Sequence, residues 1–61
     1  MSEFTRHSKI ELLLQERPFI SVNELTGVLG VSAATIRRDI DKLDETGRVQ
    51  KVYGGIAAAD S

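Results

Sequence analysis

The stretch SVNELTGVLGVSAATIRRDIDKLDETG, residues 21–47, decides the fold of this chain. It predicts two helices, over residues 22–29 and about 33–46, with almost nothing between them. Gly30 stops the first helix, because glycine takes the left-handed conformation without steric cost. Ser32 is a good N-cap for the second helix. Two helices joined by so short a glycine-containing turn are the signature of a helix-turn-helix.

Each of the two helices carries one apolar face. Ser21 and Glu24 have capping-box spacing, in which the serine accepts from the glutamate N–H and the glutamate side chain reaches back. We expect Val31 to bury its side chain between the helices and Gly47 to end the second helix. The inward residues are predicted to be Val22, Leu25, Val28 and Leu29 in the first helix and Ile36, Ile40 and Leu43 in the second.

A further helix is predicted upstream, from about Thr5 to Arg17. Ser2 or Thr5 caps its start, and Pro18 ends it because the residue before proline avoids helical dihedral angles. Leu12 falls on its outer side, where an exposed leucine usually has no role; the alternative is a contact with another part of the protein or a second subunit. Its inward residues are Ile10, Leu13 and Leu14.

Downstream, the chain predicts a β-hairpin. Two short β-prone runs, residues 48–53 and 56–58, flank a double glycine. Val49 and Val52 should point to opposite faces of the hairpin, which a bulge or a strongly twisted edge would accommodate. Upstream, Phe19-Ile20 is too short for more than a stub of strand. The fold class is therefore mostly α with a small β-hairpin: a winged helix-turn-helix of three helices plus a wing. We assign residues 1–57 to it and 58–61 to the start of a linker or a frayed end.

Length and composition exclude several classes of protein. Sixty-one residues make one domain, and 41% hydrophobic with 28% charged residues is ordinary for a folded one. There is no cysteine, and the lone His7 has neither a metal-ligand set nor a catalytic partner. We therefore expect no metal, no cofactor and no enzymatic activity. No apolar run approaches the ~20 residues of a membrane span and the start is not a signal peptide, so we expect a cytoplasmic protein.

The net charge of −1 gives no hint of nucleic acid, so the argument rests on where the charges lie. The outward face of the 33–46 helix is acidic in its second half, at Asp41, Asp44 and Glu45. Small side chains, hydroxyls and arginines suit a helix whose N-terminus enters the DNA major groove. Alternatively the charges pair along a solvated helix, Arg37 or Arg38 with Asp41 and Lys42 with Glu45. The first half of the face is small or basic: Ser32, Ala33, Ala34, Thr35, Arg37 and Arg38.

The hairpin favours DNA, because its two charges, Arg48 and Lys51, are both positive. Such a wing can follow the phosphate backbone or enter the minor groove. The alternative is that the glycines only make a turn while Tyr53 covers the edge of the core. At the start of the first helix, Arg6 and His7 are further phosphate candidates, although exposed polar residues there are more often only solvated. The candidate contacts in the wing are Arg48, Lys51, Tyr53, Gly54 and Gly55.

Several of these residues form a pattern that resembles a known family. The run VSAATIRRDI at residues 31–40, with Leu43, Gly47 and the Tyr-Gly-Gly of residues 53–55, is similar to the N-terminal domain of DeoR-family bacterial transcriptional regulators. Arg6-His7 with Ile10, and SVNEL at residues 21–25, fit the same pattern.

This resemblance implies a winged-helix domain that binds a double-stranded DNA operator, usually within a repressor of sugar or nucleoside catabolism genes. It places Ser32, Thr35, Arg37 and Arg38 on the recognition helix and leaves open that one of these arginines braces Asp39 instead. It also implies an absent C-terminal domain that binds an effector, a phosphorylated sugar or related metabolite, and drives homo-oligomerisation.

We expect the isolated domain to be monomeric. The alternative function is a winged-helix protein-interaction module without DNA binding, because a fold does not fix its function, and an RNA-binding winged helix is a weaker third.

Overall fold

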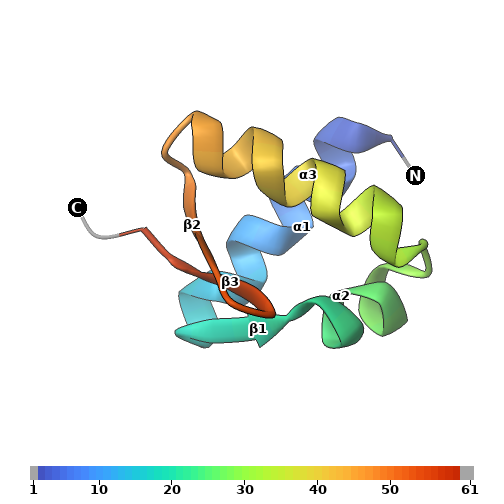
Figure 1. The fold of residues 1–61 in the computed structure, drawn as a ribbon, viewed down its shortest axis with the longest axis horizontal. Coiled ribbons are helices and arrows are strands. Elements are labelled where there is room, and N and C mark those ends of the chain that lie inside the picture. The colour runs from blue at the N-terminus through green and yellow to red at the C-terminus, as the bar shows by residue number, and fades with distance from the viewer. Residues whose placement is uncertain (1, 60–61) are drawn as a thin grey trace.

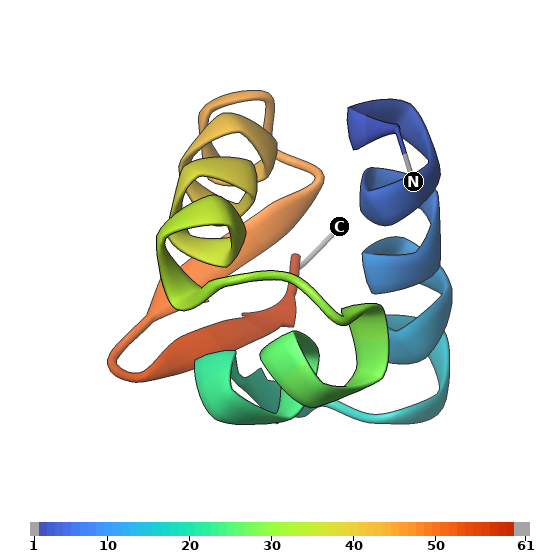
Figure 2. The same ribbon diagram turned by 90° about the vertical axis from the view of Figure 1, so that its right-hand side faces the viewer.

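The computed structural model describes residues 2–59 and contains three helices and three strands (Figure 1). The strands form one antiparallel sheet in the order β1-β3-β2. In Figure 2, α1 and α3 stand on opposite sides, α2 lies across one end, and the hairpin projects beside α3. The predicted winged helix-turn-helix is confirmed. Its elements are α1 Glu3–Glu16, β1 Phe19–Ser21, α2 Val22–Leu29, α3 Ala33–Glu45, β2 Val49–Val52 and β3 Gly55–Ala58.

A serine caps each helix. Ser2 rather than Thr5 caps α1, and its Oγ accepts a hydrogen bond from the Thr5 N–H at 3.1 Å. Ser21 and Ser32 cap α2 and α3 in the same way. The capping box is only half formed: the Glu24 N–H donates to the Ser21 Oγ, but the Glu24 carboxylate pairs with Arg17 instead of reaching back.

The turn of the helix-turn-helix has the predicted geometry. Gly30 ends α2 in the left-handed conformation, at φ 68°, and Val31 packs half-buried against the core. Residues 30–32 are the whole connection between α2 and α3, and Figure 2 shows this stretch crossing from the end of α2 to the start of α3.

The core lies where the three helices meet the sheet. Val28 was predicted to face inward but is 56% exposed. The buried stripe of α2 runs through Leu25 and Leu29, and Val28 lies about 100° around the helix from Leu29, beyond that stripe. Leu13 is only partly buried. The buried apolar residues are Ile10, Leu14, Ile20, Leu25, Leu29, Ile36, Ile40, Leu43, Val49 and Ile56.

The hairpin pairs in a regular register from Val49↔Ala58 to Val52↔Gly55, with no bulge among these residues. Val49 is buried, whereas Val52 is half-buried on the other face. Strand β3 continues through Ala58, whose N–H donates to the Pro18 carbonyl at 3.3 Å. Ala58, which was predicted to be the first linker residue, thus lies in the sheet, and residues 60–61 of the predicted linker lie outside the described part of the chain.

Candidate DNA interface

The first turn of α3 presents a small, polar surface. Ser32 and Ala34 are exposed, and Ala33 and Thr35 are half-buried. The Ser32 Oγ accepts from the Thr35 N–H at 3.2 Å and lies 3.1 Å from the Thr35 Oγ1. The first N–H groups of a helix lack intrahelical acceptors and carry partial positive charge. This end of α3 is therefore suited to approach an anion closely.

Arg37 and Arg38 are both exposed, and neither makes an ion pair or a side-chain hydrogen bond within residues 2–59. They are unusual in this, because five of the eight lysines and arginines pair with carboxylates; Lys9 is the third without a partner in that range. Two adjacent arginines on α3 are thus available to an external anion. The five paired cations are Arg6, Arg17, Lys42, Arg48 and Lys51.

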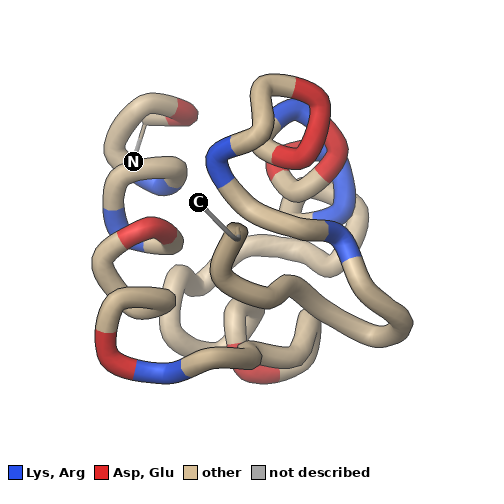
Figure 3. Tube along the Cα trace, turned by 90° about the vertical axis from the view of Figure 1, so that its left-hand side faces the viewer, with Lys and Arg blue, Asp and Glu red and all other residues tan. Residues whose placement is uncertain are grey.

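The ion pairs predicted along α3 do not form within the described residues. Lys42 reaches Glu3 on α1, with Nζ 2.9 Å from Oε2, rather than Glu45. This bond from Lys42 holds the pKa of the Glu3 carboxyl below its ordinary value. Asp41 pairs with Lys51 of the wing rather than with either arginine. Figure 3 shows the basic and acidic segments of α3 beside the basic segments of the hairpin.

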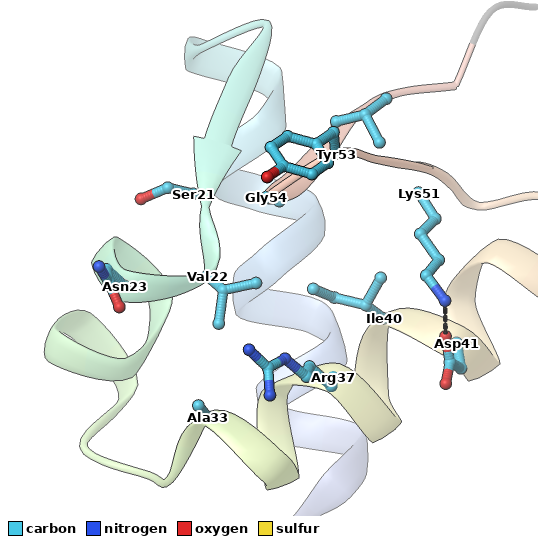
Figure 4. A pocket seen from close by; sticks show the side chains of 12 residues that line it. Ser21, Val22, Asn23, Ala33, Arg37, Ile40, Asp41, Lys51, Tyr53 and Gly54 are labelled. Atoms are coloured by element: carbon cyan, nitrogen blue, oxygen red, sulfur yellow. Dashed lines mark hydrogen bonds and ion pairs between the residues drawn. The ribbon is translucent and has the colours of Figure 1, made fainter.

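A groove of about 610 Å³ separates α3 from the wing and the start of α2 (Figure 4). Arg37 lines this groove, whereas Arg38 lies outside it. The groove also contains Ser21 and Asn23, which the sequence analysis did not place in the site. The capping serine at the start of α2 was the available signal, because N-terminal helix turns attract phosphate. The groove is lined by Ser21, Val22, Asn23, Ala33, Arg37, Ile40, Asp41, Lys51, Val52, Tyr53, Gly54 and Gly55.

The wing tip is fixed by two glycines with different roles. Gly54 takes a left-handed φ of 78° in the turn. Gly55 lies so close to β1 that a Cβ there would be 2.2 Å from the Ile20 carbonyl oxygen. The Val22 N–H donates to the Gly54 carbonyl at 3.0 Å, which attaches the tip to α2. Tyr53 is fully exposed, so the alternative in which it covers the core edge is wrong.

Both cations of the wing are paired in the free domain. The Lys51 Nζ lies 2.7 Å from the Asp41 Oδ1, and the Lys51 backbone N–H donates to the Asp44 Oδ1 at 3.1 Å. The hydrogen bond to Asp41 raises the pKa of Lys51 above its ordinary value. Arg48 lies 3.5 Å from Glu11 of α1. The acidic half of α3 therefore holds the wing, which no local spacing in the sequence indicated.

A largely buried group of polar side chains lies inside the domain, between α1 and α3. The Arg6 guanidinium donates two hydrogen bonds to Asp39, from Nε at 2.6 Å and from Nη2 at 3.1 Å. His7 Nε2 lies 3.2 Å from the same carboxylate but is not aligned for a hydrogen bond. Both side chains are only 14% exposed, so the expectation that they are exposed is wrong. Arg6, and neither Arg37 nor Arg38, braces Asp39.

The position of Asp39 explains this cluster. Asp39 shares the inward stripe of α3 with Ile36 and Ile40 and is 1% exposed. Burial opposes ionisation of the carboxyl, but the two hydrogen bonds and the charge of Arg6, with His7 close by, prevail and hold its pKa below the ordinary value. The same bond to Asp39 raises the pKa of Arg6.

The comparisons with known proteins agree with this geometry. The family model for the DeoR-like helix-turn-helix domain matches residues 6–61. Over 56 residues the chain is 41% identical to the HTH-type transcriptional repressor CsqR of Escherichia coli K12, covering 92% of this chain and 22% of that protein. Over 58 residues it is 43% identical to the HTH-type transcriptional regulator UlaR of Escherichia coli O1:K1, a match that covers 95% of this chain and 23% of that protein.

The chain thus spans less than a quarter of the length of these relatives. No solved structure gives a significant match. Within the described part of the chain, none of the helices combines the length and the apolar character needed to cross a bilayer. Because the family model matches nearly the whole chain, this chain belongs to the DeoR-like helix-turn-helix family and is a DNA-binding domain that acts in transcriptional regulation.

Proposed function

We propose that α3 enters the major groove of an operator with its N-terminal half first, while the wing follows the phosphate backbone. The observation that carries this is the adjacent pair Arg37 and Arg38, which have no partner within residues 2–59 although most other cations have one. Arginine can donate two hydrogen bonds to guanine O6 and N7. Arg38 lies on the outer side of α3, and Arg37 beside the groove. We assign base contact to Arg38 first.

The remaining contacts are proposed to position the domain. Phosphate contacts fix register and orientation without reading sequence. Arg6 and His7 are not included, because they are mostly buried against Asp39. The positioning set is Ser32, Ala33, Ala34 and Thr35 at the start of α3 and Arg48, Lys51, Tyr53, Gly54 and Gly55 in the wing.

We further propose that the whole protein is a cytoplasmic repressor of sugar or nucleoside catabolism genes. The family resemblance supports the target genes, and one relative is named a transcriptional repressor. Both relatives are more than four times as long as the matched region, which supports a linker after Ala58 leading to a further domain. That domain would bind a phosphorylated sugar or related metabolite and form homo-oligomers. The domain alone is proposed to be monomeric.

The test is a gel-shift titration of genomic DNA fragments at several salt concentrations. A DNA-binding domain loses affinity as salt rises, because bound counterions are released from the DNA. Arg38→Ala is compared with Lys9→Ala, since each removes one cation without an ion pair in the described chain, but only Arg38 lies on α3. Equal effects of the two variants would contradict the assigned interface. Salt-independent capture of a protein without DNA binding would favour the interaction-module alternative.

A further inference from the structure

The contact between Lys51 and Asp41 joins the wing to the recognition helix at the groove. Asp41 Oδ1 accepts from the Lys51 Nζ at 2.7 Å, although Arg37 is one turn away on the same helix and lines the same groove (Figure 4). Asp41 therefore pairs with Lys51 of the wing and leaves Arg37 without a partner within the described chain.

The strand does not depend on this ion pair for its position. The Lys51 backbone N–H is bonded to Asp44, at 3.1 Å, and the wing tip is bonded to Val22. The Lys51 side chain can therefore leave Asp41 while β2 stays in place. The two partners are 57% and 59% exposed, so water surrounds the pair. Ion pairs this exposed are weak and readily exchanged.

A carboxylate and a phosphate offer the lysine the same chemistry, an anionic oxygen acceptor. We propose that Asp41 is a built-in substitute for a DNA phosphate, which holds Lys51 in the free domain and is displaced by the backbone on binding. The proposal rests on the function proposed above. It makes Asp41 a determinant of affinity and salt dependence, because each Lys51–phosphate contact is gained at the loss of a Lys51–Asp41 contact.

The test uses Asp41→Asn, with Glu45→Gln as its matched control. Both changes remove one negative charge from α3, but Glu45 is exposed and has no ion pair within the described residues. Asp41→Ala is the second variant, since asparagine can still accept a hydrogen bond from Lys51. Each is measured alone and with Lys51→Ala, by fluorescence anisotropy on a short labelled duplex of mixed sequence over a range of NaCl concentrations. Circular dichroism verifies folding.

We expect both Asp41 variants to bind about two- to five-fold more tightly than Glu45→Gln, the range that an exposed ion pair allows. Their plots of log affinity against log salt should steepen by up to about one unit, for one more net phosphate contact. With Lys51→Ala present, the Asp41 variants should match Glu45→Gln.

Two results would overturn the proposal. If the wild type binds DNA and the Asp41 variants match Glu45→Gln or bind more weakly, Asp41 only organises the wing, and the proposed function stands. If the wild type shows no salt-dependent binding at all, the proposed function fails and this inference fails with it.

Discussion

Two of the three aspartates of helix α3, Asp39 and Asp41, each hold a cation from another element, and their surroundings differ completely. Asp39 is 1% exposed and accepts two hydrogen bonds from the Arg6 guanidinium. Asp41 is 59% exposed and accepts one from the Lys51 ammonium. Removing one partner of a buried pair leaves a desolvated charge, whereas an exposed partner returns to water. The same helix thus has one ion pair that fixes the fold and one that can be exchanged.

The largest expected effect tests the buried member of the comparison. Asp39→Ala should lower the free energy of unfolding by about 3 kcal/mol, the low end for a broken buried pair because Arg6 keeps some access to water. That is a large share of the stability of so small a domain. Urea denaturation measures it, with Asp41→Ala as control. If both variants lose the same stability, the distinction between the two pairs is wrong.

Because Arg6 is the arginine that pairs with Asp39, we expect Arg37 and Arg38 to be available to DNA. Arg38→Ala tests this expectation. Specific binding should weaken by about 1–3 kcal/mol, with relaxed preference at one base pair, if Arg38 donates both hydrogen bonds to a guanine. Folding stability should change by less than about 0.5 kcal/mol, as at other surface sites. Titrations on single-base operator variants and thermal melts measure the two effects. A variant that unfolds while keeping its base preference would make Arg38 structural.

The pH dependence of stability tests the charge of the buried aspartate, Asp39. The folded pKa of Asp39 is lowered, so its contribution is complete above the unfolded pKa of about 3.9 and is lost as pH falls through the folded value. The stability gap between the wild type and Asp39→Asn should be constant above about pH 5 and narrow below about pH 4. Urea midpoints across this range measure the gap. A gap that stays constant below pH 4 would show that the charge of Asp39 does not contribute.

The smallest effect is expected at the exposed pair. Asp41→Ala should shift the Tm by less than about 4 °C, since the exposed Lys51 ammonium that loses its partner is hydrated by water instead. Differential scanning calorimetry at low and high salt provides the measurement. A larger, salt-independent loss would mean that the Lys51 contact supports the wing, and the comparison would then have to be abandoned.

Signals within a few residues predicted the elements correctly. Ser21, Gly30 and Ser32 act on the backbone next to them, so the helix ends could be read from residue type. The burial of Asp39 was also predictable, because Asp39 falls on the apolar stripe with Ile36 and Ile40. The expected partners, Arg37 or Arg38, were wrong, since Arg6 of α1 takes that place.

The partners of the charges could not be predicted in this way. Arg6 and Asp39 are 33 positions apart, and Lys51 and Asp41 are 10 apart on different elements. Such pairs depend on how the helices and the hairpin pack, and the spacing rule for one helix favoured the wrong pairs, such as Arg37 with Asp41. The exposure of Val28 has the same origin, because only packing decides which part of a mixed face is covered.

The wing tip requires glycine at its two positions for different reasons, and substitution with a D-amino acid would distinguish them. Gly54 has a backbone conformation that is natural for a D-amino acid. A chemically synthesised domain with D-alanine there should be more stable by about 0.4–1 kcal/mol, because the unfolded chain loses freedom. At Gly55 the obstacle is the carbonyl of Ile20, against which an L-alanine has no room. Gly54 thus adopts a backbone conformation that suits a D-residue, which the ribosome does not incorporate. Gly55 is required only because it has no side chain.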